Sequence, residues 1–191
     1  MDAAGPEAPL SFVDGCHPSC AGRPAHGWIK RGATVELKFD HGRTRITING
    51  ALSWPDRTLI HREEIITSAA MIRLFADLEA RHPEAAEIAV VLDNARYNRS
   101  REIEAWLDRP GRRLKLIYLP PCAPKLHLIE RFWHVMKRKV LFNKAYAKFA
   151  LFKQAFDAFF ERLNEHEADL ASLITDRFHL IGQPDAGIPS A

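Results

Sequence analysis

The strongest constraint on the fold of this chain is one short apolar run and the segments that follow it. Ile88–Leu92 reads IAVVL, a β-branched run that predicts a strand covered on both faces. The run ends at Asp93-Asn94, and the pattern then predicts a helix over Arg99–Leu107 and a strand over Leu114–Leu119. A strand, a helix and a strand at this spacing form a βαβ unit with parallel pairing and a right-handed crossover. The chain is therefore predicted to have an α/β fold.

Shorter β-rich segments precede this unit. Leu10–Val13 is an apolar run that predicts a buried strand with Asp14 at its end. Further predicted strands are Thr34–Phe39, Thr44–Leu52 and Thr58–His61, with a hairpin turn at residues 40–42 between the first two. Hairpin strands followed by a βαβ unit predict a mixed sheet.

Three helices are predicted from apolar residues that recur at helical spacing. The first is capped by Ser68 and carries a stripe of Met71, Leu74, Phe75 and Leu78. The second covers Leu126–Val140 after the stiff PPCAP loop. The third covers Ala147–Leu163 and holds five of the 11 phenylalanines, which favour a role in the core or in an interface over base stacking.

Length and composition predict a single globular domain. The chain has 191 residues and 47% hydrophobic residues, which is enough for one core. No segment approaches the roughly 18 consecutive apolar residues of a membrane span, and the N-terminus does not resemble a secretory signal. These features predict a cytoplasmic protein.

The charge is unevenly distributed along the chain. The formal net charge is only +3, but residues 96–153 contain 15 Lys and Arg against 4 Asp and Glu. A basic half beside an acidic remainder indicates a polyanion partner such as DNA, because clustered cations release counterions from phosphates. The alternative is a set of solvated helix faces.

The cysteines do not indicate a disulfide framework. There are three, an odd number. Cys16 and Cys20, with His17 and His26 nearby, have a spacing that zinc tolerates, but Cys122 is isolated and no second pair follows. A zinc site is therefore a minor alternative.

Three carboxylates lie at the ends of predicted elements. Asp14 and Asp93 each follow a predicted strand, and Glu130 opens the helix after the PPCAP loop. If the two strands are neighbours, both aspartates leave the same edge of the sheet, and the helix can bring the glutamate close. Such a cluster of like charges persists only if cations neutralise it, and oxygen ligands favour Mg²⁺ or Mn²⁺. Each carboxylate alone could equally be a turn or a helix cap.

The same residues carry a family resemblance. The segments are FVD at 12–14, GRTRITINGAL at 42–52, VVLDNARYN at 90–98 and LHLIERFWHVMKRKV at 126–140. Together they resemble the DDE catalytic domain of bacterial insertion-sequence transposases, in the branch of insertion-sequence family six-thirty, which is related to the mariner-like transposases. The resemblance runs over about residues 10–181 and leaves residues 1–9 and 182–191 as flexible ends.

The resemblance implies a ribonuclease-H-like mixed sheet flanked by helices, with Asp14, Asp93 and Glu130 as catalytic residues that bind two Mg²⁺ or Mn²⁺ ions. Family members cut DNA at the ends of their element and join the freed 3′ ends to a target, usually at a TA dinucleotide. Asn94 and His134 are expected to support the carboxylates by hydrogen bonds. The expected phosphate contacts are Arg96, Arg99, Lys125, Arg131, Lys137 and Arg138, with exposed charge as the alternative for each.

Two departures from the family pattern stand out. Relatives commonly have Asn-Pro before the Ile-Glu pair, where Asn caps the helix, and here His127 and Leu128 take those places. The start of this helix and the aim of Glu130 are therefore expected to differ. Full-length relatives also carry an N-terminal helix-turn-helix region, which this chain is expected to lack. A truncated copy, a frameshifted fragment or one half of a two-frame transposase would each account for that difference.

Three alternatives stay open at this point. The chain could be an inactive remnant that binds only DNA or another transposase subunit, with a homodimer contact expected at the Phe-rich helix. It could be a metal-dependent nuclease with no role in transposition. His127, Glu130 and His134 could also bind a transition metal, although their spacing matches no usual zinc hydrolase motif.

Overall fold

A computed structural model describes residues 9–20, 31, 44–120 and 127–173 of the chain. The predicted strand at 34–39, the turn at 40–42, Lys125, Cys122, His26, most of the PPCAP loop and both predicted flexible ends, apart from residue 9, lie outside the described residues.

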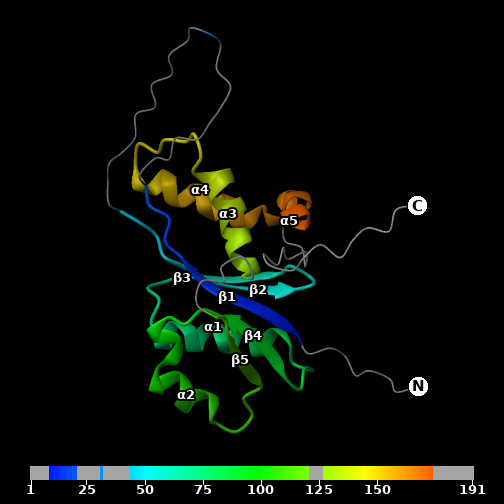
Figure 1. Ribbon diagram of the computed structural model, residues 1–191. Helices are drawn as coiled ribbons and strands as arrows, with labels where there is room; N and C mark the ends of the chain where they lie inside the picture. The colour runs from blue at the N-terminus through cyan, green and yellow to red at the C-terminus, as the bar shows by residue number, and fades with distance from the viewer. Residues whose placement is uncertain (1–8, 21–30, 32–43, 121–126, 174–191) are drawn as a thin grey trace, which may run out of the picture.

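A five-stranded mixed sheet lies at the centre of the molecule, in the order β3-β2-β1-β4-β5 (Figure 1). The strands are β1 (Leu10–Cys16), β2 (Ile48–Trp54), β3 (Leu59–Glu63), β4 (Ile88–Leu92) and β5 (Leu114–Tyr118). β1, β2 and β3 pair antiparallel, whereas β4 pairs in parallel with both β1 and β5. The predicted βαβ unit and the mixed sheet are confirmed.

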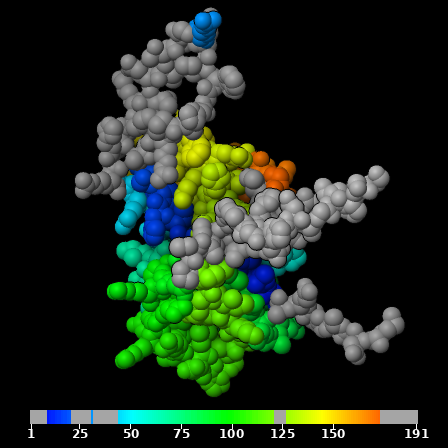
Figure 2. All heavy atoms as spheres, in the orientation of Figure 1, coloured from blue at the N-terminus to red at the C-terminus, as the bar shows by residue number. Residues whose placement is uncertain are grey.

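Helices cover both faces of this sheet. They are α1 (Ser68–Arg81), α2 (Arg101–Leu107), α3 (Leu128–Val140), α4 (Phe149–Glu161) and α5 (Glu167–Leu173), with 3₁₀ turns η1 (Arg96–Arg99) and η3 (Leu163–His166). α1 and α2 lie on one side, and α3, α4 and α5 lie on the other (Figure 1). In the space-filling view, blue and cyan residues of the first strands are visible between the green region that contains α1 and α2 and the yellow and orange region of the C-terminal helices (Figure 2).

Alternation along the strands divides the buried side chains into two cores. Phe12 and Val91 pack with α3 and α4 on one face, whereas Val13 and Val90 pack with α1 and α2 on the other. Because successive side chains of a strand point to opposite faces, one apolar run supplies both cores. This explains why β4 has no polar residue.

Several predicted boundaries need correction. β1 extends to Cys16 because it stays paired with β2, so Asp14 is not its last residue. The cap of α1 is Thr67 and not Ser68, since the Thr67 hydroxyl accepts from the backbone N–H of Ala70 (3.2 Å). The strand predicted over Thr44–Leu52 is shifted to β2, and α3 and α4 are each shorter than predicted by two or more residues. η3 and α5 were not predicted from the sequence.

The Phe-rich helix α4 contributes mainly to the core. Phe152, Phe156 and Phe159 are buried against α3, which confirms the predicted core role for these three. Phe149 and Leu151 are 38% and 49% exposed at the start of the helix. Within the part of the chain that the structure describes, no helix is both long enough and apolar enough to cross a bilayer.

One partly buried polar network joins the start of β5 to the end of α1. The Arg113 guanidinium donates to the backbone oxygens of Glu79, His82, Pro83 and Ala85 at 2.6–3.0 Å. The Glu79 carboxylate accepts from the Arg113 backbone N–H and from Arg112, both at 2.6 Å. Arg113 thereby satisfies carbonyls that the C-terminus of a helix leaves without partners.

We expect Arg113→Ala to lower the free energy of unfolding by about 2–3 kcal/mol, because several hydrogen bonds from a charged donor to partly buried carbonyls are lost. Urea unfolding monitored by circular dichroism measures this change. Arg109→Ala, at an exposed arginine in the turn after α2, is the matched control and should change stability by less than about 0.5 kcal/mol. Equal effects of the two substitutions would contradict the structural role of Arg113.

Candidate active site

The sheet brings Asp14 and Asp93 to the same edge. β1 and β4 run in parallel, and their last paired residues are Val13 and Leu92, so an aspartate comes next on each strand. Phe12 and Cys16 pack on the α3 side of the sheet. Because alternate residues of a strand share a face, the Asp14 side chain lies on that side too. This confirms that the two predicted strands are neighbours.

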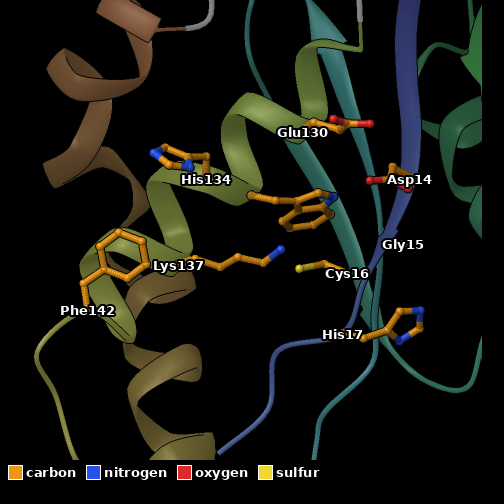
Figure 3. Close-up of a pocket in the computed structure, with 9 residues that line it drawn as sticks. Asp14, Gly15, Cys16, His17, Glu130, His134, Lys137 and Phe142 are labelled. Atoms are coloured by element: carbon orange, nitrogen blue, oxygen red, sulfur yellow. The ribbon is translucent and has the colours of Figure 1, made fainter. Parts of the chain in front are cut away.

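Glu130 faces this edge from the first turn of α3. A pocket of about 500 Å³ opens between β1 and α3, lined by Asp14, Gly15, Cys16, His17, Glu130, Trp133, His134, Lys137 and Phe142. Figure 3 shows the Glu130 carboxylate pointing toward Asp14, whereas the His134 ring turns away from it. Asp93 is not among the described residues that line this pocket.

Asp14 carries the most perturbed carboxyl group of the site. Its pKa is raised to about 7, mainly by burial and also by the negative charges of Glu130 and Asp93, against opposing effects of the Gly15 backbone N–H and Lys137. Burial also raises the pKa of Glu130. The three carboxylates are therefore close enough to repel one another, as the sequence predicted.

The donor set fits a hard divalent cation, because it consists of carboxylate oxygens whose charges are not fully compensated. Among the described residues, however, no three His, Cys, Asp or Glu side chains are close enough to hold one ion together. The arrangement thus provides carboxylates around a pocket and not a closed three-ligand site. By the same finding, His127, Glu130 and His134 do not form a metal-binding group among the described residues. Cys16 and Cys20 are both buried and do not form a disulfide with each other.

Asp93 is held in place by a residue that the sequence analysis did not single out. The buried Asn98 side chain donates to Asp93 Oδ1 (2.8 Å), and the backbone N–H of Ala95 donates to the same oxygen (3.1 Å). Asn98 ends the VVLDNARYN segment, so its presence in that motif was the available signal. Asn94 instead donates to the Leu119 backbone oxygen (2.6 Å), which ties the ends of β4 and β5 together.

Lys137, which the sequence analysis named only as a phosphate contact, also lines the pocket. Its ammonium points toward the Cys16 sulfur (Figure 3), and hydrogen bonding to Lys137 partly offsets the burial that raises the Cys16 pKa to about 11. Its positive charge also lowers the pKa values of Asp14 and Glu130. Lys137 therefore supplies part of the positive charge that the carboxylates need.

The other predicted phosphate contacts are spread over different surfaces. Arg96 and Arg99 are exposed in η1, just after Asp93. Arg99 donates to Asn94 and stacks on the Tyr118 ring at 4.5 Å. Arg138 lies 3.9 Å from Asp169 of α5, and Arg131 is partly buried on α3.

His127 stands at the N-cap of α3 without forming a capping hydrogen bond. Its ring is 2% exposed, and the ring centroid lies 6.0 Å from that of Phe12. The helix nevertheless begins at Leu128, and the Glu130 N–H donates to the His127 oxygen (3.0 Å). The exchange of Asn for His thus removes the cap but leaves Glu130 in the first turn.

Comparison with known proteins identifies this arrangement. A family model described as DDE superfamily endonuclease matches residues 9–153. The chain belongs to this family. The predicted resemblance is thereby confirmed, and the matched segment includes all three carboxylates.

Individual relatives agree with the family assignment. The Insertion element IS630 uncharacterized 39 kDa protein of Shigella sonnei is 30% identical over 77 residues, which covers 40% of this chain and 22% of that protein. The crystal structure of the Mos1 mariner paired end complex with Mn superposes with a TM-score of 0.59 at 15% identity, covering 89% of this chain and 56% of that one. The Mos1 transposase paired-end complex with left transposon end gives 0.58 at 13% identity and the same coverage.

These structural neighbours confirm the ribonuclease-H-like fold, a mixed five-stranded sheet with flanking helices. The chain spans about half the length of the Mos1 chains and about a fifth of the Shigella protein.

The raised pKa of Asp14 predicts a pH-dependent cost in stability. Between about pH 4 and pH 7 the folded chain keeps a proton on this carboxyl that the unfolded chain releases, so stability falls as the pH rises toward 7. In EDTA at pH 8, Asp14→Asn should raise the free energy of unfolding by up to about 4 kcal/mol, and the gain should vanish near pH 4. Glu102→Gln, on the exposed face of α2, is the control. A gain that grows toward low pH would contradict this assignment.

The lowered pKa of His127 predicts the opposite dependence of stability on pH. Burial lowers the pKa of its ring to about 4, against the opposing effect of Asp93, so the folded chain excludes a proton that the unfolded chain binds below about pH 6.5. Stability is therefore lost as the pH falls from 6.5 toward 4. His127→Gln should become more stable relative to the parent by up to about 3 kcal/mol over this range. His134→Gln, at an exposed position of the same helix, is the matched control in chemical unfolding.

Proposed function

We propose that this chain is the catalytic domain of an insertion-sequence transposase, which cleaves DNA phosphodiester bonds and transfers the 3′ ends to a target. The observation that carries the proposal is the common edge of the sheet at which Asp14 and Asp93 follow paired strands while Glu130 faces Asp14 across a pocket. This geometry, together with the family match over residues 9–153, supports an assignment of the three carboxylates as catalytic residues and metal ligands.

Two divalent cations, Mg²⁺ or Mn²⁺, are the proposed cofactors. Mos1 structures similar in fold to this chain include complexes with Mn and with Mg. When bound, two such ions would activate a water or a 3′ hydroxyl and stabilise the leaving oxygen of the phosphodiester. The carboxyl oxygens of Asp14, Asp93 and Glu130 would hold them, because hard oxygen ligands suit these cations.

The remaining residues of the site orient and balance these carboxylates. Asn98 and the Ala95 N–H fix the direction of Asp93 through Oδ1. Lys137 places a positive charge in the pocket beside Asp14 and Glu130. Asn94 would support Asp93 indirectly, by holding the ends of β4 and β5 together. His134 would support the site from the part of the pocket wall that faces away from Asp14. Charge neutralisation and positioning account for most catalysis of this kind.

DNA is the proposed substrate, with a TA-containing target and action as a homodimer in the cytoplasm. Arg96 and Arg99 belong to η1, which follows Asp93 in the chain, and would contact phosphates close to the site. Arg131, Lys137 and Arg138 would extend this contact along α3, and Lys125 lies outside the described residues. The excess of basic residues over 96–153 supports a polyanion partner.

Nicking of supercoiled plasmid by the purified chain tests the proposal. We expect cleavage that requires Mn²⁺ or Mg²⁺ and is abolished by EDTA. Asp93→Asn and Glu130→Gln should each lower the cleavage rate more than about 100-fold. The reason is that removing a residue that only hydrogen-bonds to a metal ligand already lowers metal affinity or activity by about 10–100-fold. Glu102→Gln, also an acidic-to-amide change, is the matched control and should keep the parent rate.

Two results would replace the proposal by one of the other functions. DNA binding without nicking above the Asp93→Asn background would identify an inactive remnant. Nicking without joining of pre-cut 3′ ends to a second DNA would identify a metal-dependent nuclease with no part in transposition.

A further inference from the structure

Helix α3 makes an unusually close contact with the sheet at Gly50 of β2. A Cβ atom at Gly50 would lie 2.8 Å from both Cη2 and Cζ2 of Trp133, and 3.5 Å from Cδ1 of Ile129. Carbon atoms of packed side chains prefer about 3.5–4.0 Å. The absence of a side chain at Gly50 therefore allows the Trp133 indole to rest directly on the strand.

The backbone conformation does not explain this glycine. Gly50 lies inside a regular strand paired on both sides, and the one glycine with a positive φ in the described part of the chain is Gly111. A glycine within a strand lowers β stability and often marks a close approach by another group. At Gly50 the approaching group is Trp133.

The contact lies next to the two facing carboxylates. Gly50 is the direct β2 partner of Asp14 in the antiparallel pair. Trp133 follows Glu130 by three residues, so the two side chains are neighbours on the surface of α3. The separation between strand and helix at Gly50 therefore also sets how far Glu130 stands from Asp14.

Trp133 has little freedom to move aside. Its side chain is 2% exposed and packs edge-on against Phe132 with ring centroids 5.2 Å apart. It also forms part of the pocket wall between Glu130 and Lys137. A larger residue at position 50 must then displace the helix and not only the ring.

We propose that Gly50 and Trp133 are positioning residues, whose contact holds Glu130 at the distance from Asp14 that metal binding requires. This inference rests on the proposed function, since it assigns a purpose to the distance between two of the proposed ligands. Neither residue supplies a ligand atom. Both act through the placement of α3 on β1 and β2.

The experiment is a double-mutant cycle that measures Mn²⁺ affinity by calorimetry or by electron paramagnetic resonance. We expect Gly50→Ala to weaken Mn²⁺ binding by about tenfold or more, because the added methyl group moves Glu130 outward. Trp133→Phe removes the ring atoms nearest Gly50 and should weaken binding by a few fold. In the double variant the methyl group occupies the space left by the indole, so affinity should recover above either single variant.

A destabilising change elsewhere separates positioning from a general loss of packing. Val90→Ala shortens a buried side chain of β4 on the opposite face, toward α1 and α2, and should lower stability without changing Mn²⁺ affinity. If Val90→Ala weakens binding as much as Gly50→Ala, or if the effects of the cycle simply add, the inference is wrong.

Crystal structures provide a readout that does not depend on metal. The Gly50→Ala variant should show a wider separation of Asp14 and Glu130. The double variant Gly50→Ala/Trp133→Phe should show the separation of the parent chain. An unchanged separation in the Gly50→Ala single variant would overturn the inference. If Gly50→Ala folds only together with Trp133→Phe, an unchanged Mn²⁺ affinity of the Trp133→Phe single variant would overturn it instead. Absence of Mn²⁺ binding by the parent chain would instead count against the proposed function alone.

Discussion

The parallel pairing of β1 with β4 is the interaction on which the candidate site depends. Its register ends at Val13 and Leu92, so the next residue on each strand is an aspartate at the same edge. A slip of one residue would send the apolar side chains of either strand to the wrong face, and both faces are covered by helices. The hydrophobic cores therefore keep two like charges near each other, against their repulsion.

The candidate site also depends on the placement of α3. One face of this helix packs on the sheet, and the adjacent face carries residues of the pocket. Ile129, Phe132, Trp133 and Met136 are buried against the sheet and α4. Glu130 and Lys137 stand beside this stripe and line the pocket, two turns apart. Because helical neighbours are three or four residues apart, the packing that anchors the stripe also aims the charged pair. Stability and the geometry of the site are thus coupled through one element.

The charge of the site is only partly balanced by the protein. Burial raises the pKa values of Asp14 and Glu130, while Lys137 lowers them, and burial keeps the His127 ring neutral next to Asp93. A site of this kind stores unfavourable electrostatic energy in the folded chain, and a bound cation can release it. That imbalance explains why the carboxylates favour a divalent metal over a structural role in turns or caps.

Local patterns in the sequence were enough to predict β4, the βαβ unit, the helix that carries Glu130, and the three carboxylates, because apolar periodicity and the polar residue that ends a strand are properties of short segments. The family motifs added the fold, which the comparisons confirm. Only the tertiary structure decided that Asn98 holds Asp93, that Lys137 enters the pocket while Arg138 pairs with α5, and that Gly50 admits Trp133. Most of these contacts join segments distant in the chain, and all of them depend on how tightly each helix packs on the sheet, a distance that no periodicity records.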